Sequence, residues 1–185
     1  SSVEKFRQVH PNFHYLPHAY DSAIHSPDLV DHFKDGEVPS HDVVFVGTGF
    51  PERVELLSAV DWRGIDFGLY GYWHNAIGSR HKLRKYLVKN RPIDNAYTAA
   101  LYRNAKIGLN LHRTSIHFGF GSPKIEHAES LNPRAYELAA CGCFHLSDYR
   151  AEVEEVFGEN VPTFKTAAEL RQLIDEFLAF REARE

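Results

Sequence analysis

The sequence alternates between short apolar runs and stretches with helical spacing from residue 42 to residue 166. The apolar runs are brief and unbroken, a pattern typical of strands that are covered on both faces. They lie at 42–46, 66–71, 107–111 and 143–146. Helical patterns lie at 52–60, 79–88, 94–104 and 132–140, and two more begin near residues 148 and 166. This order predicts an α/β fold, in which a parallel sheet has helices on both faces.

Capping residues place several helix ends. Asn132 followed by Pro133 predicts a helix start, and Gly142 suits the end of that helix. Asp148 is expected to cap the next helix. Thr166 begins a Thr-x-x-Glu capping box, which predicts the start of the last helix.

The first forty residues lack this regularity. Their prolines, at positions 11, 17, 27 and 39, exclude a long helix. We expect a short strand at 13–16 and a linker from 19 to 40. The chain holds no methionine and begins in the middle of this pattern, so we expect it to be a piece of a longer protein.

Composition narrows the function classes. The chain has 185 residues, of which 43% are hydrophobic and 25% charged, which excludes disorder and coiled coil. No apolar run approaches the ~20 residues of a membrane span, and no signal peptide opens the chain. A net charge of −4 disfavours binding to a nucleic-acid duplex. Cys141 and Cys143 are expected to be buried thiols, which favours a reducing, cytoplasmic location.

Ligands of such sheets bind at the carboxyl ends of the strands. Gly47 and Gly49 follow the first strand there, and Arg53 lies in the next helical turn. Glycines let a backbone approach a phosphate closely, and a helix N-terminus and an arginine attract anions. Neither a complete dinucleotide fingerprint nor a Walker A motif is present, so a tight turn with a surface arginine is the alternative.

The segment 129–137 is the stronger candidate. Its capped helix leaves free N–H groups around Ser130, Leu131 and Asn132, and Arg134 adds a cation. Glu137 lies one turn into the helix, where its carboxylate could accept two hydrogen bonds from a vicinal diol. Glu129 precedes the helix and could contact a sugar. The alternative is a well-capped helix with solvated charges.

Other clusters carry less weight. The basic run 80–85 is interpreted as a solvated helix face, with an anionic partner as the minority alternative. His10, His14 and His18 have metal-ligand spacing, but prolines interrupt the helix, so no metal site is predicted. Three histidines, at positions 112, 117 and 127, lie in the long loop that follows the third strand, and any of them could touch a ligand.

Together these segments resemble a known family. The runs 42–53 and 105–113 are similar to the C-terminal domain of GT-B glycosyltransferases, and the run 130–150 resembles the spore-maturation CgeB-like members. The resemblance covers nearly the whole chain. It implies a Rossmann-like domain at 41–165, a C-terminal helix at 166–185, and at 1–40 a hinge strand and linker from an N-terminal domain that the chain lacks.

The resemblance also implies a nucleotide-diphosphate sugar as substrate, with no cofactor and no metal. Glu137 would hold the ribose hydroxyls, and Glu129 would face the donor sugar. The diphosphate would lie by Gly47, Gly49 and Arg53, beside the N–H groups of 130–132. The lysine that usually follows the arginine is missing, and Lys124 or Arg113 would replace it. The base would stack near 91–93, and transfer to an unknown acceptor would retain configuration.

The expected function is therefore donor binding in a glycosyltransferase, with little or no turnover by the isolated chain. Two alternatives stay open. One is a non-catalytic nucleotide-binding subunit. The other is a nucleotide-sugar enzyme on the same fold, such as a 2-epimerase, which would act on the donor itself.

Overall fold

The computed structural model describes residues 2–29, 32–34, 36–116, 121, 123–125 and 129–184. Within them a six-stranded, fully parallel sheet has the order β3-β2-β1-β4-β5-β6. The strands are β1 (Val43–Val46), β2 (Phe67–Tyr70), β3 (Leu87–Lys89), β4 (Ile107–Asn110), β5 (His145–Asp148) and β6 (Thr163–Phe164). The predicted α/β, Rossmann-like fold is confirmed.

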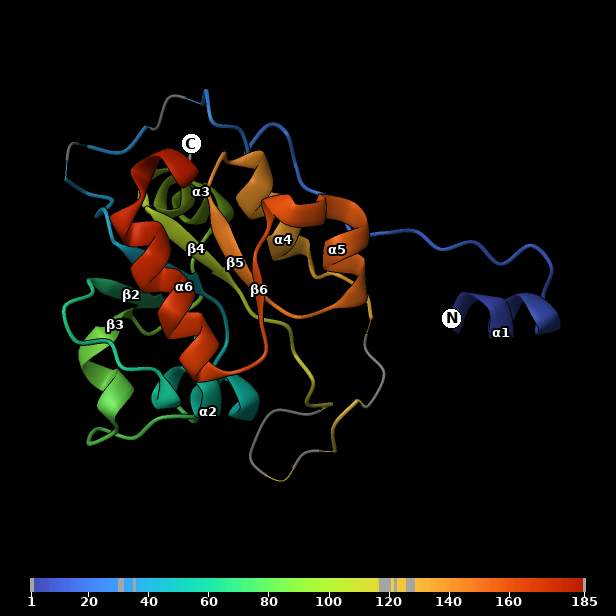
Figure 1. The fold of residues 1–185 in the computed structure, drawn as a ribbon, viewed down its shortest axis with the longest axis horizontal. Coiled ribbons are helices and arrows are strands. Elements are labelled where there is room, and N and C mark those ends of the chain that lie inside the picture. The colour runs from blue at the N-terminus through green and yellow to red at the C-terminus, as the bar shows by residue number, and fades with distance from the viewer. Residues whose placement is uncertain are drawn as a thin grey trace.

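Helices cover both faces of this sheet, and Figure 1 shows the two layers. The helices of the described residues are α1 (Ser2–Val9), α2 (Pro51–Ala59), α3 (Asn95–Asn104), α4 (Pro133–Ala140), α5 (Ala151–Phe157) and α6 (Ala167–Ala179), with 3-10 turns η1 (Lys82–Tyr86), η2 (Gly158–Asn160) and η3 (Arg181–Ala183). The helix α1 stands away from the sheet, joined to it by an extended segment (Figure 1). No described helix is both long and apolar enough to cross a membrane.

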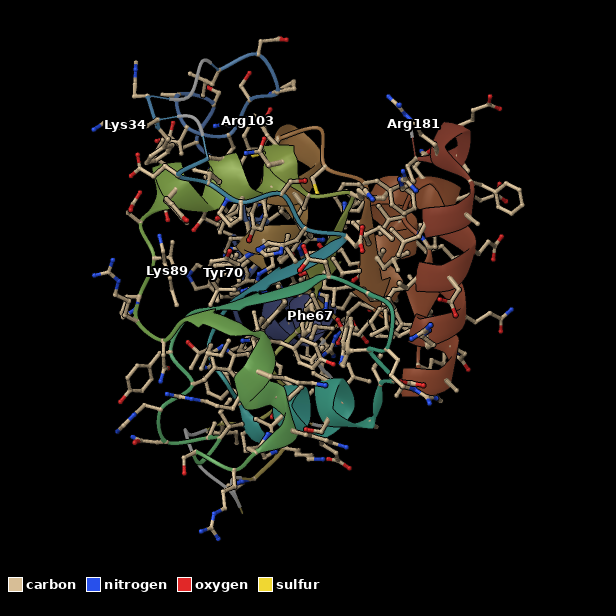
Figure 2. The ribbon with its side chains drawn as sticks, turned by 90° about the vertical axis from the view of Figure 1, so that its left-hand side faces the viewer. Lys34, Phe67, Tyr70, Lys89, Arg103 and Arg181 are labelled. Carbon is tan, nitrogen blue, oxygen red and sulfur yellow. The ribbon has the colours of Figure 1, made fainter. Side chains whose placement is uncertain are left out.

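Two apolar layers hold the sheet. Phe45, Leu69 and Leu109 point to one face, where they pack with side chains of α2 and α6. Val44 and Tyr70 point to the other face and pack with α3 and α4. Figure 2 shows Tyr70 and Lys89 on this second side, where the ammonium of Lys89 lies 3.4 Å from the ring centre of Tyr97.

The strand order puts the topological switch point of the sheet between β1 and β4. The chain runs outward from β1 to β2 and β3, then returns through α3 to β4 on the other side of β1. At such a topological switch point the connections leave the sheet on opposite faces, so their turns diverge above the carboxyl ends. Any ligand site of this sheet is therefore expected above Val46 and Asn110, the last residues of β1 and β4.

Gly71 brings the turn after β2 against the turn after β1. Its φ is +115°, and a Cβ at this position would lie 2.1 Å from the carbonyl oxygen of Gly47. Only glycine adopts this conformation and also permits this contact. The two turns thus form one packed rim beside the switch point.

Three local predictions are wrong. The basic run 79–88 forms the short η1 and the edge strand β3 rather than one helix. Residues 13–16 belong to no strand, and α1 precedes them. Asp148 ends β5 and caps no helix, because its carboxylate bonds to His112 while Arg150 occupies the N-cap position of α5.

The other caps are confirmed. The side chain of Asn132 accepts a hydrogen bond from the N–H of Ala135, and Thr166 does the same for Glu169. Gly142 follows α4 with a φ of +67°. Cys141 and Cys143 are buried thiols, as expected, and burial raises the pKa of Cys143 to about 12.

Candidate functional site

Two arginines from different helices meet at the switch point. Arg53 of α2 donates from Nη1 to the carbonyl oxygen of Thr48 (3.0 Å) and from Nη2 to that of Leu111 (2.7 Å). Arg134 of α4 donates from Nε to Val46 (2.8 Å) and from Nη1 to the same Leu111 oxygen (3.3 Å). The carbonyl of Leu111, just after β4, thus joins the two guanidinium groups.

Aromatic rings complete the arginine cluster. Both guanidinium carbons lie over the ring of Phe45, at 5.4 Å for Arg53 and 4.9 Å for Arg134. Arg53 also lies 5.4 Å from the ring centre of Phe50, and the exposed Arg113 lies 5.2 Å from the same ring. Cation–π contacts of this kind hold cations without neutralising their charge.

The cluster is strongly positive. Among the described residues, no carboxylate forms an ion pair with Arg53, Arg113 or Arg134. Burial and the neighbouring charges of Arg134 and Arg113 together lower the pKa of Arg53 to about 9, although the charges of Glu52 and Asp148 act to raise it. The Nε of Arg53 is buried without a hydrogen-bond partner. A buried cation in this state favours an anion beside it.

The two glycines of the first turn make room for neighbouring side chains. A Cβ on Gly47 would lie 2.8 Å from Nη2 of Arg134, and one on Gly49 would lie 2.6 Å from the Trp73 ring. Gly47 therefore lets Arg134 reach across the edge of the sheet to β1.

Glu52, on the first turn of α2, holds the loop after β4. Its carboxylate accepts hydrogen bonds from the N–H groups of Thr114 (2.7 Å) and Ser115 (3.1 Å) and from the hydroxyl of Ser115 (2.5 Å). Burial alone would raise the pKa of Glu52, but these hydrogen bonds outweigh it and lower the pKa. This side chain positions residues 112–115 beside the arginines.

The N-terminus of α4 closes the other side of the site. Asn132 caps the helix, and its Nδ2 also approaches the carbonyl of Leu111 at 3.4 Å. The N–H of Leu131 is already taken, because it donates to Glu152 of α5 at 2.5 Å. The other oxygen of Glu152 accepts from the hydroxyl of Tyr15 at 2.6 Å.

Glu137 lies on α4, one turn beyond Arg134, and is partly buried. The charges of Glu137 and Arg134 both act on the buried hydroxyl of Tyr102. Burial raises the pKa of Tyr102, the charge of Arg134 lowers it, and the charge of Glu137 raises it. Glu137 and Arg134 therefore share one neighbourhood.

The remaining candidates take part in none of the described contacts of the arginines. Glu129, Ser130 and Lys124 are exposed. Lys124 pairs with Ser115 in a single antiparallel bridge. No described hydrogen bond or ion pair joins Glu129 or Lys124 to the arginines. His117 and His127 lie outside the described residues.

Sequence reasoning missed Asp148 and Glu52 as partners of the loop that follows β4. Asp148, at the end of β5, accepts from Nδ1 of His112 at 2.7 Å. Both residues follow apolar runs in the sequence, but their contact depends on the pairing of β4 with β5, which the sequence alone does not show. No sequence signal existed for Glu52, whose partners lie 62 and 63 residues along the chain.

The described residues also line grooves elsewhere. One of about 510 Å³ lies between α2 and η1, beside Val54, Ser58 and Lys82. A second, of about 160 Å³, lies under the N-terminal segment beside Phe33 and Arg103. Figure 2 shows Arg103 on α3 beneath that segment, where it donates to the carbonyl of Ser26 at 3.1 Å. The described residues contain no cluster of three metal-ligating side chains.

Comparison with known proteins shows to which family the chain belongs. No curated protein matches the chain. A family model described as glycosyl transferase-like matches residues 53–185, which include Arg53, Arg113, Arg134 and Glu137. The match covers most of the chain and begins at the first arginine of the cluster. The chain therefore belongs to the glycosyl transferase-like family.

Proposed function

We propose that the chain is the donor-binding part of a GT-B glycosyltransferase, and that it binds a nucleotide-diphosphate sugar above β1 and β4. Membership of the glycosyl transferase-like family supports a transferase with a sugar donor and an acceptor. The observation that carries the site is the convergence of Arg53 and Arg134 on the Leu111 carbonyl without a carboxylate ion-pair partner among the described residues.

In this proposal the diphosphate neutralises the arginine cluster. Arg113 is exposed and Arg134 partly exposed, so both can donate to phosphate oxygens directly. Arg53 is only 6% exposed and acts mainly through its charge. The first turn of α4 contributes its positive helix end.

Glu137 is proposed to accept hydrogen bonds from the ribose hydroxyls. It lies one turn from Arg134 on the same helix α4, so the two side chains are neighbours and one ligand can contact both. Glu129 would then face the donor sugar, as the resemblance implies, and the outcome at the sugar carbon would be retention.

The chemistry asked of this chain is electrostatic. As the bond between the sugar carbon and the diphosphate oxygen breaks, negative charge grows on the leaving diphosphate. The acceptor hydroxyl oxygen bonds to that carbon and passes its proton to the leaving diphosphate oxygen. The three guanidinium groups stabilise that negative charge. Electrostatic stabilisation of this kind is the largest single contribution to catalysis in many enzymes. Since the proposed acceptor site belongs to an N-terminal domain, the chain alone is expected to bind nucleotide and to turn over little.

Calorimetric titration of UDP, GDP, dTDP and ADP into the chain tests the donor site. One of these nucleotides should bind, and Arg134→Gln and Glu137→Gln should each weaken it at least tenfold, about 1.4 kcal/mol. Arg84→Gln and Glu55→Gln remove the same charges from exposed positions away from the site and should leave affinity unchanged. Failure of all four nucleotides to bind a folded chain, or equal losses in the controls, would overturn the proposal.

A further inference from the structure

We propose that His112 binds the diphosphate through Nε2, with its imidazole bridging the phosphate and the carboxylate of Asp148. This inference rests on the proposed function and adds one more residue to those that bind the diphosphate. The sequence left three loop histidines open, and the structure gives reasons to choose this one.

Two hydrogen bonds fix the ring of His112. The main-chain N–H of His112 and its Nδ1 both donate to Oδ1 of Asp148, at 3.0 and 2.7 Å. The side chain of His112 is 4% exposed and that of Asp148 is 26% exposed, so the pair lies just beneath the surface. Because Asp148 accepts the proton on Nδ1, the ring is oriented and its free nitrogen is Nε2.

That free nitrogen has no partner. Nε2 of His112 is buried without a hydrogen bond, as is Nε of Arg53. Buried polar atoms are nearly always satisfied in folded proteins, so two unsatisfied atoms near one site indicate a missing ligand. An anion with several oxygens can serve both.

The position of His112 matches that ligand. It follows Leu111, whose carbonyl oxygen receives both guanidinium groups. The charge of Asp148 acts on Arg53, so the pair lies within electrostatic reach of the cluster. Arg113 is the next residue, and Glu52 of α2 holds the loop two residues further on.

The charges around the ring favour a phosphate over a sugar hydroxyl. Asp148 of β5 pairs with the ring, while Arg53 of α2, on which the charges of Asp148 and Arg113 both act, attracts an anion to this part of the site. An imidazole between two anions is stabilised in its protonated form. Binding of the diphosphate therefore draws a proton onto Nε2, which then donates a charge-assisted hydrogen bond.

Inorganic pyrophosphate is the probe, because it occupies the anion site without base or ribose. Titration of the chain at pH 7.5, in two buffers with different ionisation enthalpies, gives both affinity and proton uptake. Wild type should take up as much as one proton more than His112→Gln, and the variant should bind at least tenfold more weakly. Asp148→Asn should also reduce the uptake, because the ring loses its carboxylate.

His145→Gln is the matched control. His145 of β5 is equally buried, with an unpartnered Nε2, but among the described residues it has no carboxylate partner, and burial lowers its pKa to about 4. Its substitution should leave proton uptake unchanged. An imidazole ¹⁵N spectrum of the wild-type chain, with and without pyrophosphate, reports protonation of Nε2 even if His112→Gln does not fold.

Three results would overturn the inference: unchanged uptake in His112→Gln, an Nε2 signal that pyrophosphate does not alter, or no pyrophosphate binding by wild type. The nucleotide titration remains a separate test. A nucleotide diphosphate that binds wild type and His112→Gln equally would leave the donor site in place and remove only His112 from it.

Discussion

Substituting Glu52 with glutamine tests how the loop after β4 is held. The carboxylate accepts three hydrogen bonds, from two main-chain N–H groups and one hydroxyl. A hydrogen bond to a charged group contributes about 1.5–3 kcal/mol and a neutral one about 0.5–1.5, so removing the charge costs about 1 kcal/mol per bond. Because Glu52 is partly exposed, solvent screening reduces the total, and we expect a loss of about 1–2 kcal/mol.

The pH dependence of stability separates the contribution of the Glu52 charge from that of the side chain's shape. Burial opposes ionisation of Glu52, but its hydrogen bonds dominate and lower its pKa in the folded chain. The stabilisation is therefore fully present above the unfolded-state pKa of about 4.3, and it is lost as pH falls through the lower folded pKa. The difference between wild type and Glu52→Gln should be constant from about pH 6 to 8 and should shrink in acid.

Urea denaturation followed by circular dichroism at pH 7, and at steps below pH 4, measures this difference. Glu55→Gln is the control, since Glu55 is an exposed residue of the same helix and forms no hydrogen bond or ion pair within the described part of the chain; it should change stability little at any pH. A loss below about 0.5 kcal/mol at neutral pH, or a loss that is undiminished in acid, would show that the charge of Glu52 does not hold the loop.

Three further predictions concern the rim and the core. Gly71→Ala should lower stability by at least about 2 kcal/mol, because its φ is +115° and the added Cβ meets the Gly47 carbonyl, whereas Gly78→Ala, with open space around it, should be near neutral in the same denaturation experiment. Gly47→Ala should displace the guanidinium of Arg134 and weaken nucleotide binding, and it should have little further effect on calorimetric affinity once Arg134 is glutamine. Cys143, whose pKa burial raises to about 12, should resist a thiol reagent at pH 8 until urea unfolds the chain; labelling at the rate of free cysteine in the native protein would contradict this.

Central elements were predictable because burial and local capping agree there. The unbroken apolar runs of β1 and β4 mark strands that are covered on both faces, and Asn132 caps α4 through its own side chain. The edge strand β3 was missed because it has three residues and its middle residue, Val88, is 50% exposed. Its basic flank on η1 resembles a solvated helix face, and only pairing with β2 distinguishes the two structures.

The candidate site was predictable as a region but not as a set of contacts. Arg53 and Arg134 were each identified from their helix starts, yet their shared acceptor, Leu111, carries no sequence signal. The pairing of His112 with Asp148 depends on β4 and β5 being neighbours. Sequence order alone does not fix which strands adjoin, so side-chain contacts between strand ends follow only from the topology.

The energetics of Arg53 argue that this edge serves a ligand rather than stability. A guanidinium that is 6% exposed, with one unpartnered nitrogen, beside a second guanidinium on the same carbonyl, lowers the stability of the ligand-free chain. An apolar side chain of similar volume would pack against Phe45 without that cost, although it would leave the carbonyls of Thr48 and Leu111 with fewer donors. A bound anion offsets this loss of stability, because it neutralises the two guanidinium charges that repel each other. Nucleotide diphosphate should therefore raise the melting temperature of wild type more than that of Arg134→Gln, in proportion to their affinities.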